Sequence, residues 1–288
     1  MHKLILSKPY GFCFGVKKAL LIVEETLKTH PGNTIWIINE IVHNKTIVED
    51  LEKRGVRFTQ NTADVPEGAV VIYSAHGVTP EVRAAFKNKN ITILDASCPL
   101  VQKVHDEVFR YSDLGYHIIY IGSKTHDEAR GVIAEKPENI SVVETAADIK
   151  DIQKNHQKYM VLTQTTLNMF DVEALVEKIR ELIPQVEMPA KKDLCLTTTT
   201  RQQAVKKNAH DCQLFLVVGS KNSSNSKKLR DIAELEGCTS YLIDSAHEIQ
   251  PDWLTHNPNV CLTSGASAPD FLIDEVIKLL TETYGYHY

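Results

Sequence analysis

The chain has 288 residues, enough for one large domain or two to three smaller ones, each with a hydrophobic core. Hydrophobic residues make up 43% and charged residues 24%, as in ordinary globular proteins, and the net charge is −5 without any Lys/Arg-rich tract. This composition excludes broad binding to nucleic acid or to a membrane surface. No apolar run approaches the length of about 18 residues that a membrane span needs, and the first one is too short for a secretory signal. We therefore expect a cytoplasmic protein.

Short apolar runs recur along the chain, and most end in a polar motif. These strand-like runs cover residues 3–7, 34–38, 70–73, 91–94, 117–121, 159–162, 214–218 and 260–262. Apolar residues at helical spacing follow at 16–27, 172–183 and 272–280. Short strands without alternation, separated by helices, predict parallel sheets that are covered on both faces. In such sheets, ligands gather at the carboxyl ends of the strands.

Three cysteines share one local setting. Cys13, Cys98 and Cys195 each follow an extended segment and precede a helical pattern. A thiol near a helix N-terminus is favoured as thiolate by the unpaired N–H groups and the macrodipole. The spacings of 85 and 97 residues are domain-sized and unlike a local Cys-x-x-Cys clip. We therefore predict that the three sulfurs meet at one metal centre.

The residues themselves leave the kind of centre open. Zinc with three cysteines and a histidine is one possibility, although structural zinc sites usually come from close local pairs. An iron–sulfur cluster with one open iron draws ligands from distant segments more readily. Three structural cysteines near helix starts are the plain alternative. The other three cysteines, Cys212, Cys238 and Cys261, lack this setting, and Cys261 lies in an apolar run typical of a buried structural thiol.

The polar motifs at the strand ends indicate an anion site. The run from Asn222 to Ser226 is rich in hydroxyl and amide groups before a helix, and residues 265–269 open another. Both suit phosphate oxygens. His43, His76 and His126 add donors, although a single histidine is more often structural and Ser/Asn clusters are often caps.

Glu128 has two interpretations from the sequence alone. It lies two residues after His126, past a strand end, where a general acid is useful. A glutamate in the first turn of a helix is equally favoured by the helix dipole alone.

The collinear set of motifs resembles the LytB/IspH family, the hydroxymethylbutenyl diphosphate reductases, over nearly the whole chain. The matching segments are Gly11-Phe12-Cys13-Phe14-Gly15-Val16, Val42-His43-Asn44, Ser74-Ala75-His76-Gly77-Val78, Asp95-Ala96-Ser97-Cys98-Pro99-Leu100-Val101, Thr163-Gln164-Thr165-Thr166-Leu167, Cys195 to Arg201-Gln202, Val218 to Ser226, and Gly265-Ala266-Ser267-Ala268-Pro269.

The resemblance implies an α/β fold, a trefoil of three pseudo-equivalent α/β domains with parallel sheets around a central 4Fe–4S cluster. The domains that we expect are residues 14–97 with His43 and His76; residues 98–193 with His126, Glu128 and Thr165; and residues 1–13 plus 194–288 with Ser223, Asn225 and Ser267.

The resemblance also assigns the site residues. Cys13, Cys98 and Cys195 are expected to be the cluster ligands, with the fourth iron left without a protein ligand. Glu128 and Thr165 are the expected catalytic residues, Glu128 delivering protons and Thr165 positioning the substrate hydroxyl. The expected substrate-binding residues are His43, His76, His126, Thr165, Thr198, Ser223, Ser224, Asn225 and Ser267.

The implied reaction is reductive dehydroxylation of (E)-4-hydroxy-3-methylbut-2-enyl diphosphate to isopentenyl and dimethylallyl diphosphates, with ferredoxin or flavodoxin as electron donor. We expect a monomer or weak homodimer. The sequence departs from the family pattern beside the proton donor, because Ser123 stands where a second histidine is common and Asp127 where proline is common. Thr200 and Phe14 are further departures.

Two readings from other classes compete with this one. A zinc-dependent phosphohydrolase would use the same Cys and His residues and would be colourless. A non-enzymatic iron–sulfur sensor would keep the fold but needs no diphosphate site, so the polar motifs around Ser223 and Thr165 argue against it.

Overall fold

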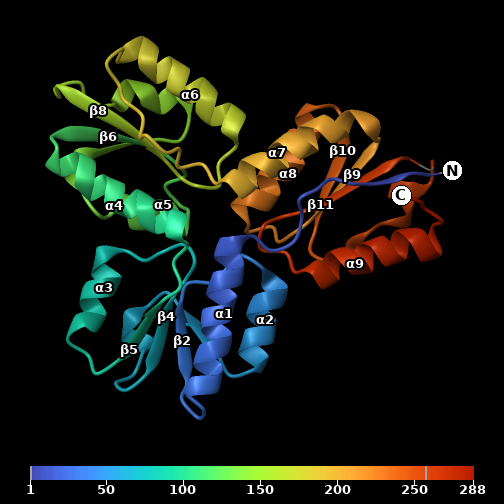
Figure 1. Ribbon diagram of the computed structural model, residues 1–288, viewed down its shortest axis with the longest axis horizontal. Coiled ribbons are helices and arrows are strands. Elements are labelled where there is room, and N and C mark those ends of the chain that lie inside the picture. Colours follow the sequence, from blue (N-terminus) through green and yellow to red (C-terminus); the bar gives the residue numbers. More distant parts are fainter. Residues whose placement is uncertain (1, 257) are drawn as a thin grey trace. The chain divides into compact units, whose positions relative to one another are not determined.

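The computed structural model describes residues 2–256 and 258–288 of the chain. It contains three parallel β-sheets flanked by helices (Figure 1). Contacts divide the described residues into two compact units. The first comprises residues 1–16, 43–49 and 196–288, and the second comprises residues 17–42 and 50–195.

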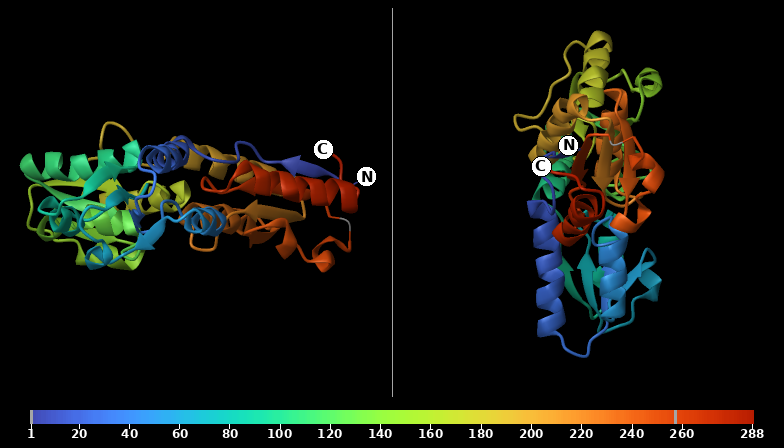
Figure 2. Two further views of the ribbon diagram at one scale, coloured as in Figure 1. Left: turned by 90° about the horizontal axis from the view of Figure 1, so that it is seen from below. Right: turned by 90° about the vertical axis from the view of Figure 1, so that its right-hand side faces the viewer.

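The first unit is built on one four-stranded sheet in the order β1-β11-β9-β10. Its elements are β1 (Leu4–Leu6), α7 (Leu196–Asn208), β9 (Leu214–Val218), α8 (Ser224–Leu235), β10 (Thr239–Ile243), β11 (Val260–Ser264) and α9 (Asp270–Lys278). Lys3 bridges to His287, so the two ends of the chain lie side by side in this unit (Figure 2).

Both faces of this sheet are buried. Leu214, Leu216 and Val218 pack in one core with Ile273 and other apolar residues of α9. The alternate residues of β9 point to the opposite face and are equally inaccessible to water. Helix α8 packs against β9 and β10. Burial of each large aliphatic side chain contributes about 1.5–3 kcal/mol, which fixes the strands and the loops that leave them.

The second unit contains two parallel sheets, in the orders β3-β2-β4-β5 and β7-β6-β8. The strands are β2 (Ile35–Ile38), β3 (Arg57–Thr59), β4 (Val70–Tyr73), β5 (Thr92–Asp95), β6 (Tyr116–Ile121), β7 (Ile140–Val143) and β8 (Lys158–Thr163). The helices are α3 (Pro80–Lys87), α4 (Pro99–Asp113), α5 (Asp127–Ile133) and α6 (Met169–Leu182). Helices α1 (Phe14–Thr29) and α2 (Lys45–Lys53) contain residues of both units.

The predicted fold class, α/β with three parallel sheets, is confirmed. Each apolar run marked in the sequence contains a strand. Sequence reasoning missed the edge strands β3, β7 and β10, although it found the edge strands β1, β5 and β8. Each missed strand carries polar residues, such as Arg57 in β3, Ser141 in β7 and Ser240 in β10, which hide the apolar pattern. The three domain ranges stay a prediction.

The predicted chemical residues follow the carboxyl ends of the strands, as we expected. In the first unit, β1 leads to Cys13, β9 to Ser223 and β11 to Ser267. In the second unit, β4 leads to His76 and β6 leads to His126. The register of the parallel pairs aligns these strand ends within each sheet, for example Val218 beside Ser264.

A buried ion-pair network holds the strand-end loops of the second unit. The carboxylate of Glu135, which stands directly after Ala134, the C-cap of α5, accepts hydrogen bonds from Arg83 of α3 at 2.6 and 2.7 Å. The Nδ1 atom of His105 in α4 lies 2.6 Å from Glu135 Oε1. Burial acts to raise the pKa of Glu135, but the hydrogen bonds from His105 and Arg83 outweigh it and lower this pKa below its ordinary value of 4.5.

The ring of His105 also leaves no room for a larger side chain at two glycines beside candidate site residues. A Cβ at Gly77, next to His76, would lie 3.0 Å from His105 Nε2. A Cβ at Gly131, on the helix that carries Glu128, would lie 3.2 Å from His105 Cε1. Gly77 also has a φ of +77°, which L side chains rarely adopt. The network therefore positions the His76 loop and α5 together.

We predict that Glu135→Gln destabilises the protein in a pH-dependent way. At pH 7 the loss of the charge-assisted hydrogen bonds should lower the free energy of unfolding by about 2–3 kcal/mol. Because the pKa of this carboxyl is lowered on folding, its stabilisation is present above pH 4.5 and is lost as the pH falls through the folded value. Urea unfolding from pH 3.5 to 7 measures the difference. The exposed Glu138→Gln is the control, and equal losses for both variants would contradict the prediction.

Candidate functional site

The three candidate cluster cysteines each stand immediately before a helix. Cys13 precedes α1, Cys98 caps α4 with Pro99 as the first helical residue, and Cys195 precedes α7. All three side chains are partly exposed, and none of the six cysteines, all within the described residues, forms a disulfide. The Sγ atom of Cys13 accepts a hydrogen bond from Val16 N at 3.5 Å. The position directly before a helix is thus the one that the sequence pattern predicts for all three.

The main-chain groups of these cysteines are tied to neighbouring strand-end loops. Cys13 N donates to Ala266 O in the first unit. In the second unit, Cys98 N donates to Ala75 O, and Cys195 N donates to Thr165 O. Each candidate ligand is thus held next to a loop that carries predicted binding residues.

The first unit carries the cluster of hydroxyl and amide groups. Ser223, the N-cap of α8, accepts hydrogen bonds at its Oγ from Ser226 N at 3.3 Å and from Ser226 Oγ at 3.0 Å. With two hydrogens accepted, the hydroxyl proton of Ser223 remains for an anion. The helix N-terminus adds its own N–H groups, so this end of α8 suits a phosphate.

Two glycines make room for this arrangement. A Cβ at Gly219, directly after β9, would lie 2.3 Å from Ser226 Oγ, and one at Gly265, directly after β11, would lie 2.0 Å from the same atom. Ser226 therefore packs across two neighbouring strand ends, and only glycine fits at both. This packing fixes the start of α8 relative to the loop of Ser267.

Within this group, Asn225 gives the clearest indication of a bound ligand. Its side chain is 4% exposed, and both atoms of its amide are buried without a hydrogen-bond partner among the described residues. Burying an amide in this way costs about 1–3 kcal/mol unless a ligand completes its hydrogen bonds. Asn225 is thus prepared for a polar ligand at the N-terminus of α8.

The remaining candidate binding residues of the first unit differ in burial and in hydrogen bonding. Ser267 Oγ donates to His43 O at 2.9 Å, so in this structure Ser267 holds the backbone of His43. Thr198 is buried in the first turn of α7, and Ser224 is half-buried. Lys45 N donates to Ser220 Oγ at 3.0 Å, which ties the His43 segment to the loop after β9.

The second unit carries a buried carboxylate–threonine pair. Thr165 N donates to Glu128 Oε1 at 2.7 Å, and Thr165 Oγ1 donates to Glu128 Oε2 at 3.0 Å. Glu128 is 1% exposed. Because both carboxylate oxygens accept, the geometry fits the ionised form. Glu128 also lies in the first turn of α5, so the structure is compatible with both interpretations from the sequence, a general acid and a first-turn glutamate favoured by the helix dipole.

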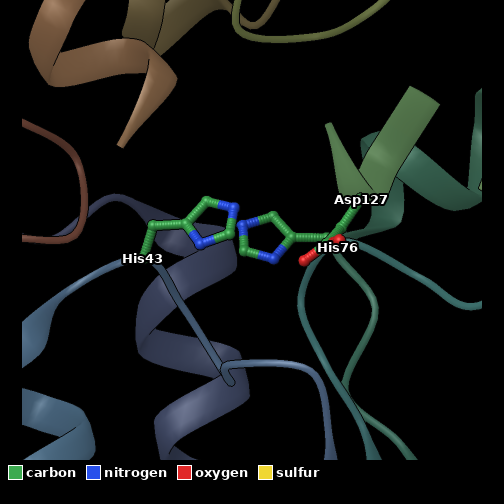
Figure 3. Close-up of side chains that lie close together, drawn as sticks. All are labelled: His43, His76 and Asp127. Carbon is green, nitrogen blue, oxygen red and sulfur yellow. The ribbon is translucent and has the colours of Figure 1, made fainter. Parts of the chain in front are cut away.

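Histidines and a carboxylate adjoin this pair. His126 is the N-cap of α5, and its Nδ1 accepts from Glu128 N at 3.2 Å, so a neutral His126 carries its proton on Nε2. The rings of His76 and His126 meet edge to face, with centroids 5.7 Å apart. Ligand atoms of His76 and Asp127 lie within 4.8 Å of each other. Figure 3 shows these two side chains, together with His43 of the first unit.

Sequence reasoning gave no role to several charged residues that lie beside candidate site residues within one unit or the other. Asp127 was noted only as a departure from the family, yet its carboxylate adjoins His76. Arg201 is 1% exposed and hydrogen-bonds two carbonyl groups. Asp193 is 3% exposed and accepts from Thr163 N at 2.9 Å. A charged residue close to a candidate ligand was the available signal.

The other three cysteines are buried in the first unit. Cys212 Sγ and Cys238 Sγ are 3.6 Å apart, and Cys261 Sγ donates to Asn208 O at 3.3 Å. The hydrogen bond with Cys238 lowers the pKa of Cys212, but the side chain of Cys261 and burial raise it, to about 12. Cys212 therefore stays a thiol at neutral pH, which is unsuited to metal ligation or nucleophilic attack.

The comparisons with known proteins agree on one family. A family model described as "LytB protein" matches residues 4–281. A protein of Azoarcus sp. strain BH72 named 4-hydroxy-3-methylbut-2-enyl diphosphate reductase is 42% identical over 285 residues, covering 99% of this chain and 91% of its own.

Two solved structures are similar to the fold. The E-1-hydroxy-2-methyl-but-2-enyl-4-diphosphate reductase from Plasmodium falciparum is 38% identical, with a TM-score of 0.95 over 99% of this chain and 90% of its own. A second, described as (E)-4-hydroxy-3-methyl-but-2-enyl diphosphate reductase, the terminal enzyme of the non-mevalonate pathway, is 33% identical. Its TM-score is 0.69 over 98% of this chain and 100% of its own.

We predict that Asn225→Leu separates binding from stability. Since the amide has no partner to lose, the free energy of unfolding should stay within about 1 kcal/mol of the original value or rise. Affinity for pyrophosphate should fall at least about tenfold, the equivalent of one or two neutral hydrogen bonds. Urea unfolding and calorimetric titration measure the two quantities. The exposed Asn155→Leu is the control, and an Asn225 variant that binds normally but unfolds easily would refute the assignment.

Proposed function

The chain belongs to the LytB family, and we propose that it reduces (E)-4-hydroxy-3-methylbut-2-enyl diphosphate to isopentenyl and dimethylallyl diphosphates. This reaction would be the last step of the non-mevalonate isoprenoid route. The single observation that carries the proposal is the buried Glu128–Thr165 pair, because removal of a hydroxyl as water needs a held proton donor at the substrate. The names of the relatives supply the substrate class.

The donor set fits a 4Fe–4S cluster with one iron left open. Cys13, Cys98 and Cys195 come from three distant segments, are not oxidised to disulfides and precede helices of 16, 15 and 13 residues. Helix N-termini stabilise the thiolate form that iron binds. When bound, such a cluster supplies electrons one at a time and a Lewis-acid position for the substrate hydroxyl. The three cysteines would hold it.

The polar side chains of the first unit would bind the diphosphate. Ser223 offers its hydroxyl proton and Asn225 its unpartnered amide, both at the N-terminus of α8. Ser224, Thr198, Ser267 and His43 are the further binding residues that we propose from this unit. Neutral donors and a helix dipole can offset buried negative charge when no Lys or Arg belongs to the binding set.

Glu128 would hold and deliver the proton. Its carboxylate accepts from Thr165 N and from Thr165 Oγ1, which fixes both oxygens. When Glu128 takes up a proton on Oε2, the Thr165 hydroxyl can rotate from donor to acceptor, because a hydroxyl serves in either sense. Thr165 would then position the substrate hydroxyl and pass the proton on. His76 and His126 would orient the substrate with their ring N–H groups.

The remaining functional assignments follow the family. We propose ferredoxin or flavodoxin as the electron donor, a cytoplasmic location, and a monomer or weak homodimer. Among helices in the described part of the chain, none has the length and apolar character to cross a membrane.

Glu128→Gln tests the role of the proton donor. The amide keeps the shape of the side chain but has no acidic proton, so we expect turnover of the diphosphate substrate to fall by about 10²–10⁴-fold. Iron content and substrate affinity should stay close to those of the original protein. Single-turnover assays under anaerobic conditions, with the exposed Glu144→Gln as control, measure this effect. Near-normal turnover would return Glu128 to a purely structural role, and phosphate release without reduction would favour a phosphohydrolase.

A further inference from the structure

Each of the three candidate cluster cysteines is followed, five or six residues later, by a cationic side chain on the next helix. Lys18 lies five residues after Cys13 on α1, Lys103 five residues after Cys98 on α4, and Arg201 six residues after Cys195 on α7. All three lie in the second turn of their helix, beyond the first turn in which the helix dipole acts most strongly, so their side-chain contacts decide what they do.

Each cation binds the segment that leads to the next candidate cysteine in the order 13, 98, 195 and back to 13. Lys18 Nζ donates to Ser97 O at 3.2 Å, directly before Cys98. Lys103 Nζ donates to Asp193 Oδ1 at 2.6 Å, two residues before Cys195.

The third contact leads from the helix after Cys195 back to the segment before Cys13. Arg201 Nη2 donates to Gly11 O at 2.5 Å, two residues before Cys13. Its Nη1 donates to Ser264 O at 2.7 Å. Each of the three contacts lies within one compact unit of the chain.

Burial strengthens two of the three contacts, those of Arg201 and of Asp193, whereas the contact of Lys18 is only partly buried. Arg201 is 1% exposed, so its charge is removed from water and its two carbonyl acceptors replace hydration. Asp193 is held on its other oxygen by Thr163 N at 2.9 Å, and Lys103 also donates to Lys191 O at 2.9 Å. Lys103 thereby fixes the residues before Cys195 at two points.

We propose that Lys18, Lys103 and Arg201 are a cyclic set of positioning residues for the cluster ligands. The cation that follows each candidate cysteine restrains the segment that precedes the next candidate cysteine. The three thiols would therefore be held in place before iron binds, and the bound iron would dissociate more slowly. This inference rests on the proposed function for the cluster, but the restraint itself exists in the protein without iron.

The set is tested first on the iron-free protein by amide hydrogen exchange. Lys18→Met should raise exchange by at least about tenfold at residues 96–98, and Lys103→Met should do so at residues 191–195, because each loses a charge-assisted hydrogen bond. Arg201→Met should raise exchange at residues 11–13. Lys18→Arg and Lys103→Arg should restore protection, since arginine keeps the charge and a donor. The exposed Lys17→Met and Lys207→Met are matched controls on α1 and α7.

Iron retention supplies the second measurement. In anaerobically purified protein, each Met variant should lose iron to a chelator at least about tenfold faster than the controls. Unchanged local exchange together with unchanged iron loss would overturn the positioning role, as would an effect spread evenly over the whole chain. If the original protein holds no cluster, the proposed function fails, while the local pattern of exchange still decides whether the three cations restrain these segments.

Discussion

A parallel sheet requires each strand to pass its chain to a crossover at the carboxyl end, and this constraint places the chemistry of the protein. Cys13, Ser223 and Ser267 follow strands of one sheet, while His76, Cys98, His126 and Thr165 follow strands of the other two. The helices that begin there present unpaired N–H groups to whatever lies at the strand ends. Thiolates, carboxylates and phosphates are all stabilised by this setting, so one architectural rule would serve the proposed metal ligands, the proposed proton donor and the proposed anion site.

Among the buried polar side chains, hydrogen bonding distinguishes Glu128 from Asn225. Glu128 and Asn225 are almost inaccessible to water, yet their hydrogen bonding differs completely. The carboxylate of Glu128 has a donor on each oxygen, whereas the amide of Asn225 has no partner among the described residues. The first arrangement holds the carboxylate that we propose as proton donor in one orientation. The second leaves a binding group unsatisfied, at a cost in folding free energy that a ligand can recover.

The sequence predicts those features that depend on local patterns. Apolar runs located the central strands and the edge strands β1, β5 and β8, and the cysteines before helical patterns stand directly before α1, α4 and α7. Edge strands such as β3 escaped because their polar residues conceal the period. The roles of His105, Asp193 and Arg201 were also out of reach, since their partners are distant in the chain. A buried charge can be recognised only when its partners are known.

The central claim is that three cysteines hold an iron–sulfur cluster with one open iron. Iron and acid-labile sulfide analysis of protein purified without oxygen, combined with a visible spectrum, tests it most directly. The account predicts about four irons and four sulfides per chain, with the broad absorption of a 4Fe–4S centre, and the loss of this absorption on replacing Cys13, Cys98 or Cys195 but not Cys212. A colourless protein that contains zinc, or no metal at all, would contradict it.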